Sequence, residues 1–334
     1  MNTVLVTGGA GYIGSHVVQQ LVARGERVVV IDNLSTGFRD AVRGAELVVG
    51  NVGDLGLVSH VMAAHKVDAV LHFAAHTIVP ESVSDPLKYY GNNTCNTRNL
   101  LACCAEAGVE KFIFSSTAAV YGVTDHGIAD EDTPTKPINP YGTSKLMSET
   151  MLRDHSATGA MRHVVLRYFN VAGCDPQGRI GHSTPNATLL IKVCCEHAVG
   201  IRESLSIFGT DYDTPDGTGI RDYIHVDDLA AAHLRALDYL RDGGDSQTLN
   251  CGYGHGYSVR EVIDAVARAR GKALNVIELP RRPGDIPMLI ACSDRLKQVL
   301  DWQPRYDDLD FIVGTALRWE QQLMRKRVPL SSVA

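Results

Sequence analysis

The sequence lacks the features that mark membrane proteins and nucleic-acid-binding proteins. It has no long apolar run, and residues 1–7 lead directly into a glycine-rich turn. We therefore expect neither a signal peptide nor a membrane span, and we expect a cytoplasmic protein. No basic run accompanies the formal net charge of -6, so neither nucleic acid nor an anionic membrane is expected as a partner.

Cysteine and histidine are present, but not in the spacing that binds metal. Eight cysteines include the adjacent pairs Cys103-Cys104 and Cys194-Cys195 without any Cys-x-x-Cys, and thirteen histidines are scattered without His-Glu-x-x-His. We therefore expect reduced, mostly buried thiols and a mechanism that uses no metal.

Short β-type runs alternate with helical stretches along the first half of the chain. The 334 residues are 45% hydrophobic and 21% charged, which is typical of one large or two moderate globular domains. The alternation predicts an α/β fold with a Rossmann-type, doubly wound parallel sheet. The runs occupy residues 4–6, 28–31, 47–49, 69–73, 111–115 and 164–168.

A glycine-rich turn follows the first of these runs. Gly9, Gly11 and Gly14 fit Gly-x-Gly-x-x-Gly, whose glycines permit a tight turn, close approach to a pyrophosphate, and close helix–strand packing. The second run ends in Asp32, where a carboxylate accepts hydrogen bonds from ribose hydroxyls and repels a 2′-phosphate. The sequence therefore predicts NAD rather than NADP. A glycine turn without a nucleotide is the alternative.

Tyr141 and Lys145 are four residues apart, so on a helix they share one face. An ammonium beside a phenol favours the ionised phenol, so we expect Lys145 to lower the pKa of Tyr141 from about 10 and to make it a general base. In isolation such a pair is more often a surface feature. Thr117 closes a strand end, where ligands of parallel sheets bind, so its hydroxyl is expected near the phenol. A turn or a helix cap is the alternative role for Thr117.

Three strings occur in the order typical of extended short-chain dehydrogenases/reductases, namely residues 7–14, 115–122 and 141–145. Within that superfamily the chain resembles the UDP-glucose 4-epimerases. The resemblance implies an NAD-dependent enzyme that interconverts UDP-glucose and UDP-galactose, with a smaller C-terminal α/β lobe for the UDP-hexose. Further strings resembling that family extend over nearly the whole chain: residues 85–93, 167–170, 207–212, 219–226 and 281–285.

The resemblance also implies which residues form the site. Catalysis would depend on Tyr141, Lys145 and Thr117. NAD would be contacted by Gly8, Gly11, Tyr12, Ile13, Gly14, Asp32, Asn33, Asn51, Val52, Phe73, Ala74, Asn92, Ser115, Tyr141, Lys145 and Phe169. The UDP-hexose would be contacted by Thr117, Tyr141, Asn170, Leu190, Phe208, Arg221, Tyr223, Arg282, Asp285 and Leu289.

In the mechanism that the family implies, Tyr141 takes the proton of the sugar 4-hydroxyl while the hydride at C4 passes to NAD. The resulting 4-keto sugar turns about its diphosphate link and takes the hydride back on its other face. Lys145 would favour the tyrosinate, and Thr117 would hydrogen-bond the 4-oxygen. Arg221 and Arg282 would match the diphosphate, with an Arg221-Asp222 ion pair as the structural alternative for Arg221.

Two other functions fit the same fold. A nucleotide-sugar 4,6-dehydratase shares the oxidation step, but it needs acidic side chains beside Thr117, where this sequence has Ala118 and Ala119. A non-catalytic NAD sensor would not need the tyrosine and lysine, because a fold does not fix an activity.

The sequence departs from the family pattern at four positions. Thr117 replaces a common serine, and Asn51 occupies a place where an aspartate usually approaches the adenine. Thr77 stands where some members have a lysine. Leu289 stands where some members have a tyrosine that narrows the pocket around the sugar 2-substituent. The smaller leucine predicts room for an N-acetyl group, and hence activity on UDP-GlcNAc and UDP-GalNAc. Simple packing in the lobe is the alternative role for Leu289.

We expect the NAD-binding domain to span residues 1–170 plus about 222–249, and the UDP-sugar lobe to span residues 171–219 plus 250–334. In the returning segment, Asp227 or Asp228 would cap a helix. The family pattern also implies a homodimer, with helices near residues 94–106 and 143–158 at its interface. Alternatively, their apolar faces only pack on the sheet.

Overall fold

A central sheet of parallel strands organises the molecule. The structure is a computed structural model, and it describes residues 2–185, 187–282 and 284–327. Every pairing within the sheet is parallel, as the alternation of runs predicted. In spatial order the strands are β12 (Gln247–Cys251), β7 (Arg162–Tyr168), β5 (Lys111–Thr117), β4 (Val67–His72), β1 (Thr3–Thr7), β2 (Arg27–Asp32) and β3 (Glu46–Val49).

Strand order reverses direction between β1 and β4, which are neighbours although two strands separate them in sequence. Ligands of open α/β sheets bind in the crevice beyond the carboxyl ends of the strands at such a switch point. The glycine turn after β1 and the segment after β4 therefore meet at the place where a nucleotide is expected.

Alternate residues of the strands feed two separate cores, one on each face of the sheet. Val4 and Val6 belong to one apolar cluster, and Leu5 between them belongs to the other. Because neighbouring side chains of a strand point to opposite faces, both faces must be covered. The covering helices are α1 (Tyr12–Ala23) and α8 (Val226–Arg241) on one face, and α2 (Leu55–His65), α5 (Asn96–Ala107) and α6 (Pro140–Ser156) on the other.

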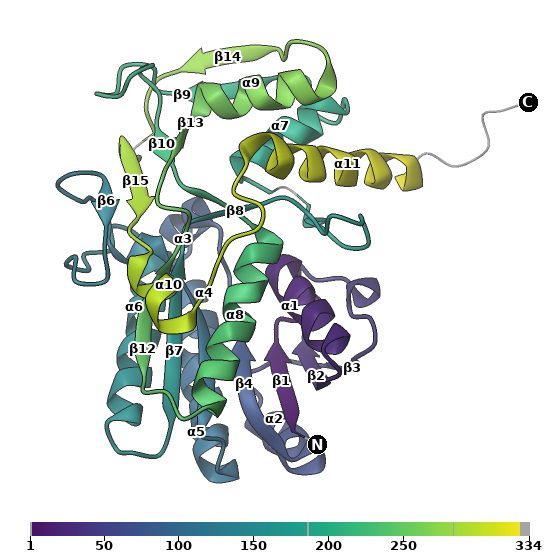
Figure 1. Cartoon of the computed structure of the whole chain (residues 1–334), viewed down its shortest axis with the longest axis vertical. Coiled ribbons are helices and arrows are strands. Elements are labelled where there is room, and N and C mark those ends of the chain that lie inside the picture. Colours follow the sequence, from purple (N-terminus) through teal and green to yellow (C-terminus); the bar gives the residue numbers. More distant parts are fainter. Residues whose placement is uncertain (1, 186, 283, 328–334) are drawn as a thin grey trace, which may run out of the picture.

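The C-terminal lobe continues the first of these cores. Val17 of α1, Ile191 and Val262 belong to one contiguous cluster of buried side chains, so the lobe is packed onto the sheet. Figure 1 shows the helices of residues 190–198, 259–270 and 309–327 in the part of the molecule away from the amino terminus, whereas the helix of residues 294–300 lies close to β12. The helices of this part are α7 (Leu190–Ala198), α9 (Val259–Arg270), α10 (Asp294–Leu300) and α11 (Leu309–Arg327).

Small sheets frame the lobe. Residues 222–249, expected to return to the cofactor domain, begin in one of them and then supply α8 and most of β12. The small sheets contain β13 (Tyr257–Ser258), β10 (Ile220–Arg221), β15 (Met288–Ala291) and β6 (Ile128–Ala129), then β11 (Tyr223–His225) with β8 (Asn170–Ala172), and β14 (Val276–Leu279) with β9 (Leu205–Phe208).

The start of α8 differs from the prediction. The N-cap residue is His225, whose Nδ1 accepts a hydrogen bond from the backbone N–H of Asp227 at 3.1 Å. Asp227 and Asp228 lie in the first turn instead, so the prediction that one of them caps the helix is wrong. Asp228 is buried and accepts hydrogen bonds from the backbone of Arg305 and Tyr306, which a local sequence pattern cannot show.

The helix expected near residues 94–106 also begins differently. A π-helical turn, η2 (Tyr90–Cys95), runs directly into α5. Such turns are rare and occur frequently at functional sites. The remaining short elements are η1 (Arg39–Ala41), α3 (Val79–Ser84), α4 (Pro86–Tyr89) and η3 (Ala118–Val120). Among the described residues, no helix is long and apolar enough to span a membrane.

Candidate active site

The glycine turn forms a cradle that leaves no room for side chains. Gly8 has a φ of +71°, and a Cβ on it would lie 2.6 Å from the backbone nitrogen of Ala74, beyond the end of β4. A Cβ on Gly14 would lie 2.3 Å from the carbonyl oxygen of Gly8. The left-handed residue of the turn is Gly8, one position before the predicted Gly9. The close packing expected at Gly14 is present.

The amino-terminal end of α1 is open toward this cradle. Gly11 is its N-cap residue, and no side chain caps it. Backbone N–H groups at an uncapped helix start carry partial positive charge and suit a pyrophosphate. The predicted contact of Tyr12 with NAD would use its backbone, since the Tyr12 hydroxyl donates to the carbonyl of Gly173 at 2.7 Å. Ile13 follows Tyr12 in the same first turn of α1.

Asp32 ends β2 and is buried. Its Oδ2 accepts from the backbone N–H of Ala10 at 2.9 Å and its Oδ1 from that of Leu34 at 2.8 Å. The carboxylate thus fixes the glycine turn and keeps further lone pairs for ribose hydroxyls. These features, the Cβ-free cradle, the open helix start and Asp32, fit NAD.

The other predicted NAD residues differ in their exposure and in their partners within the protein. Asn51 is exposed, and its Oδ1 accepts from the backbone of Gly53 and from Asn96. Asn33 is also exposed and accepts from the backbone of Ser35. Phe73 is half-buried against the ring of His233, with centroids 4.7 Å apart. The remaining predicted contacts are Val52, which is buried, Ala74 and Asn92, which are half-buried, and Ser115 and Phe169, which are buried.

Tyr141 is carried by the first turn of α6. Asn139 caps that helix by accepting from the backbone N–H of Gly142 at 2.9 Å, and a Cβ on Gly142 would lie 2.5 Å from the carbonyl oxygen of Ala119. This close approach brings the start of α6 onto the segment after β5. Tyr141 and Thr117 consequently lie close together, and the Thr117 hydroxyl favours the ionised form of the phenol.

Thr117 fills both roles that its sequence position allowed. Besides its contact with Tyr141, its Oγ1 accepts from the backbone N–H of Ala119 at 3.1 Å and caps η3. Ala118 is buried and Ala119 is half-buried. The two positions after Thr117 therefore carry only methyl groups, and neither can transfer a proton as a dehydratase requires.

Lys145 is buried one turn after Tyr141. Its Nζ donates to the backbone carbonyl oxygen of Ser115 at 2.8 Å and lies 4.8 Å from the centroid of the Phe114 ring. Burial lowers the pKa of Lys145 to about 7, and the neighbouring carboxylate of Glu149 acts in the opposite direction. The ammonium of Lys145 therefore loses its proton near neutral pH.

The expected effect of Lys145 on Tyr141 is not found. Burial raises the pKa of Tyr141 to about 12, and the group that opposes this rise is Thr117 rather than Lys145. The prediction of a lowered phenol pKa, made from the helical spacing alone, is therefore wrong for the protein's own groups. Spacing gave the shared helical face, but it could not show that both groups are buried, which disfavours both charged forms.

A pocket in the C-terminal lobe collects most of the residues predicted to contact the UDP-hexose. It extends from the segment after β7 to the strands of the lobe. Those lining it are Asn170, Leu190, Phe208, Arg221, Tyr223, Arg282 and Asp285.

The two predicted arginines are held in different ways. Arg221 donates to the carbonyl oxygens of Ile220 and Ile286, both at 2.8 Å. Arg282 lies 4.5 Å from the Phe208 ring centroid and donates through Nε to Asp285 at 2.9 Å.

The alternative of an Arg221-Asp222 ion pair is not found. The carboxylate of Asp222 accepts from the backbone N–H groups of Tyr253 and Gly254, both at 3.0 Å, and of Ala291 at 3.3 Å. Arg221 is instead available to a ligand of the pocket.

Leu289 is separate from that pocket. It is buried in β15 and belongs to a small apolar cluster that includes Ala118 and Phe169. Ala118 directly follows Thr117, so Leu289 belongs to the same cluster as a neighbour of the candidate catalytic groups.

The structure adds pocket residues that the sequence did not single out. Arg202 lines the pocket and donates to Glu196 at 2.6 Å, and Tyr212 lines it beneath the guanidinium of Arg281, 4.2 Å from the ring centroid. Tyr212 closes one of the strings that resemble the epimerases, so that resemblance could have indicated it. Arg202 has no such signal.

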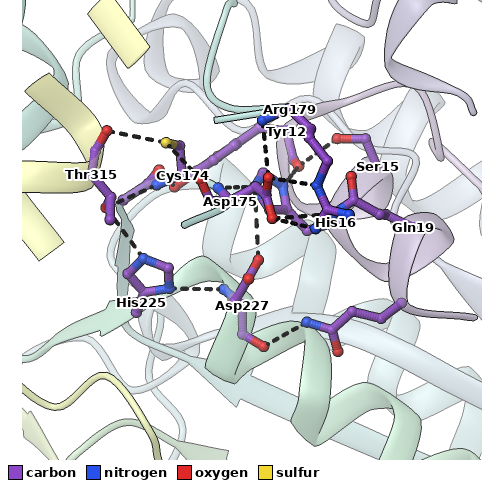
Figure 2. Close-up of polar contacts among 12 residues, drawn as sticks. Tyr12, Ser15, His16, Gln19, Cys174, Asp175, Arg179, His225, Asp227 and Thr315 are labelled. Carbon is purple, nitrogen blue, oxygen red and sulfur yellow. Dashed lines mark hydrogen bonds and ion pairs between the residues drawn. The ribbon is translucent and has the colours of Figure 1, made fainter. Parts of the chain in front are cut away.

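A buried polar network joins the glycine-loop helix to the lobe (Figure 2). The Nδ1 of His16 bonds the carbonyl of Tyr12 at 2.8 Å, and its Nε2 bonds the backbone N–H of Asp175 at 3.1 Å. Because the N–H of Asp175 can only donate, Nε2 accepts, and His16 is neutral. Burial raises the pKa of nearby Asp227 to about 7. The network fixes how α1 sits against the loop after β8.

Among the described residues, no cluster of histidine, cysteine, aspartate or glutamate could hold a metal ion. The eight cysteines are free thiols, and six of them are buried.

Comparison with known proteins gives one consistent result. The chain is 56% identical to the UDP-glucose 4-epimerase of Azospirillum brasilense over 96% of this chain and 92% of that protein. The structure superposes on the UDP-glucose 4-epimerase of Brucella ovis in complex with NAD, with a TM-score of 0.93 and 42% identity, covering 96% and 99% of the two chains. It also resembles the UDP-Glc/GlcNAc 4-epimerase of Campylobacter jejuni, with a TM-score of 0.85 and 48% identity over 96% and 100%.

Residues 4–252 match the NAD dependent epimerase/dehydratase family. This match covers the glycine turn, Asp32, Thr117, Tyr141 and Lys145. The chain therefore belongs to the NAD dependent epimerase/dehydratase family.

Proposed function

We infer that the protein is an NAD-dependent UDP-hexose 4-epimerase that interconverts UDP-glucose and UDP-galactose. The observation that carries this inference is the pairing of Tyr141 with Thr117 beside a nucleotide cradle, in a chain 56% identical to a UDP-glucose 4-epimerase. The pocket with Arg221 and Arg282 suits the diphosphate of the substrate, because guanidinium groups match phosphate geometry.

The cradle at Gly8 and Gly14, the open start of α1 and Asp32 would hold NAD. When bound, NAD supplies the acceptor and later the donor of the hydride at C4 of the sugar. Net oxidation of the sugar is zero after both transfers, so one bound cofactor serves successive turnovers.

The protein's own groups handle the proton and the orientation of the sugar. Tyr141 acts as the general base once its phenol has released its own proton to solvent: the phenolate takes the proton of the 4-hydroxyl, and the phenol so formed returns it to the same oxygen later. Thr117 hydrogen-bonds that oxygen and limits its movement. Lys145 places a positive charge beneath the strand end where the phenolate forms.

The arginine pocket permits the turn that inversion requires. If Arg221 and Arg282 hold the diphosphate, the hexose is free to rotate about its link to the phosphate while the nucleotide end stays fixed. This division separates binding, which occurs in the lobe, from chemistry at the ends of β5 and α6.

Tyr141→Phe tests the assignment of the base. The variant keeps the ring and its packing but loses the proton, so we expect at least a hundredfold lower kcat for conversion of UDP-galactose to UDP-glucose, with NAD still bound. Product formation is measured by chromatography, and the fold by circular dichroism. Tyr239→Phe, on α8, removes another half-buried hydroxyl and serves as the control. A Tyr141→Phe variant at wild-type speed would reject the assignment.

We propose that the enzyme also accepts UDP-GlcNAc and UDP-GalNAc. Leu289 lies in the apolar cluster behind Ala118, where a larger side chain would take space near the reacting sugar. The Campylobacter jejuni relative, 48% identical, is described as a UDP-Glc/GlcNAc 4-epimerase, which supports the proposal.

Leu289→Tyr tests the proposed substrate range. We expect kcat/KM for the N-acetylated pair to fall at least tenfold, about 1.4 kcal/mol, while that for UDP-glucose changes little. Ile277→Tyr, which adds a tyrosine at an exposed position of β14, is the control. Unchanged N-acetyl turnover in Leu289→Tyr would defeat the proposal.

We propose a homodimer formed through α5 and α6. Both helices cover one face of the sheet, and α6 leaves Met147 45% exposed on its outer side. A second copy of the chain packed against α6 would bury Met147.

We expect sedimentation to give twice the 36.2 kDa of one chain, and Met147→Glu to shift the equilibrium to monomer. Val83→Glu, exposed on α3, is the control. A wild-type monomer at micromolar concentration would contradict the proposal.

We propose a cytoplasmic location. The eight free and mostly buried thiols suit a reducing compartment. Recovery of the protein in a secreted fraction would contradict this.

A further inference from the structure

A buried ion pair lies behind the candidate catalytic helix. Glu149 is one turn beyond Lys145 on α6, and its carboxylate receives the guanidinium of Arg167 on β7. The Nε of Arg167 donates to Oε1 and Oε2 at 3.1 and 3.2 Å, and its Nη2 donates to Oε2 at 2.6 Å. The side chains of Glu149 and Arg167 are 7% and 9% exposed, so both charges are out of water.

Further hydrogen bonds fix this pair from several elements. Ser116 of β5 donates to Oε1 of Glu149 at 2.5 Å. The Nη1 of Arg167 donates to the hydroxyl of Tyr121 at 3.1 Å, and that hydroxyl donates to Asn250 at 2.6 Å. The carboxylate is thus locked between α6, β5 and β7 and has little freedom to move away from Lys145.

Stability does not explain this arrangement. Replacing a buried ion pair by well-packed apolar side chains is often neutral or stabilising, because desolvation of two charges offsets their attraction. Glu149 and Arg167 are, however, adjacent to groups that carry out the chemistry. Ser116 stands between Ser115, whose carbonyl accepts from Lys145, and Thr117, whose hydroxyl lies close to the Tyr141 phenol. The pair therefore contacts the strand end that both groups share.

The groups facing Lys145 leave Glu149 as its source of negative charge. On β5 these are the Ser115 carbonyl and the Phe114 ring, neither of which titrates. On β7 the Tyr168 hydroxyl accepts from Ser115 Oγ at 2.8 Å, and burial raises the pKa of that phenol. On α6, Tyr141 also has a raised pKa. Both phenols are neutral near pH 7.

His72, on β4, is neutral as well. Thr97 donates its one proton to the carbonyl of Asn93, so it must accept from His72 Nε2 at 2.8 Å. The Nδ1 of His72 then accepts from Thr7 at 2.6 Å. Burial and the charge of Lys145 lower the pKa of His72 to about 3, so this ring adds no charge near pH 7.

We propose that Glu149, held by Arg167 and Ser116, is a positioning residue that keeps Lys145 in its ammonium form on the Ser115 carbonyl while Tyr141 exchanges its proton. Glu149 is four residues beyond Lys145 on α6, so the two side chains share one helical face, and the guanidinium is bound on the β7 side. Glu149 touches neither substrate nor cofactor in this role. It acts through Lys145, and the link to turnover rests on the proposed function.

The first test is the pH profile of kcat/KM for UDP-galactose in Glu149→Gln. Without the carboxylate, Lys145 loses its proton at lower pH, so the alkaline limb should shift down by about one unit. Glu149→Asp keeps the charge and should keep most of the wild-type profile. Glu26→Gln removes a carboxylate from the Arg241 pair, whose Nη1 to Oε1 distance is 2.6 Å. This control should lower stability without moving the limb.

The second test needs no turnover. The pKa of Lys145 is lowered on folding from 10.5 to about 7, so above pH 7 the unfolded chain binds more protons than the folded chain. The free energy of unfolding therefore rises with pH between about 7 and 10.5 because of this residue. In Glu149→Gln the rise should begin at lower pH. In a Lys145→Met background, Glu149→Gln should shift the curve by a constant amount at every pH.

Two results would overturn the proposal, and a second variant covers the case in which the first does not fold. An alkaline limb that stays in place, or unfolding curves of wild type and Glu149→Gln that stay parallel from pH 6 to 10, would overturn the proposal. If Glu149→Gln does not fold because Arg167 is left unpaired, the double variant Glu149→Gln/Arg167→Gln removes both charges and takes the same two tests. If wild type proves inactive on UDP-hexoses, the proposed function fails, while the unfolding experiment still tests the coupling of Glu149 to Lys145.

Discussion

The hydrogen bond from the Lys145 ammonium to the carbonyl of Ser115 is the contact on which the rest of the site depends. It ties the second turn of α6 to the end of β5, and so brings Tyr141 beside Thr117. The same contact places a charge in a buried environment, where each charged group has a large effect on its neighbours. Burial moves the pKa of Tyr141 up and that of Lys145 down, toward the neutral form of each.

The proposed mechanism requires a rigid relationship between the sheet and the lobe, because the diphosphate would be bound in the lobe and the reacting carbon at the ends of β5 and α6. The structure provides it in two ways. A continuous apolar core runs from the sheet into α7 and α9. The hydrogen bonds of Tyr12 and His16 join the glycine-loop helix to the loop after β8. In the proposed mechanism the hexose turns about its link to the diphosphate while the sheet and the lobe stay fixed relative to each other.

Much of this architecture was predictable because its signals are local. The β-type run at residues 111–115 became β5, only two residues longer at its end, and the glycine turn opens α1 as predicted. The pocket residues Arg221 and Arg282 came from resemblance to a family, which carries tertiary information that no local pattern contains.

The features that the sequence did not predict, or predicted wrongly, depend on contacts between segments that are distant in the chain. His225 caps α8 because a buried strand ends there, and the π-helical turn at Tyr90–Cys95 has no local signature. The raised pKa of Tyr141 depends on burial by distant segments. Arg202 reaches the pocket through tertiary folding alone, and the bond between Glu149 and Arg167 joins residues 18 positions apart. Spacing along one helix could not indicate these relationships.

The central claim is that the hydride removed from C4 returns to C4 of the same sugar. It is tested most directly by incubating the protein with UDP-galactose that carries deuterium at C4, in ordinary water, and analysing the product by mass spectrometry and NMR. The account predicts UDP-glucose with the deuterium retained at C4, because Tyr141 exchanges only the hydroxyl proton. Product with hydrogen from water at C4, or no UDP-glucose at all, would contradict it.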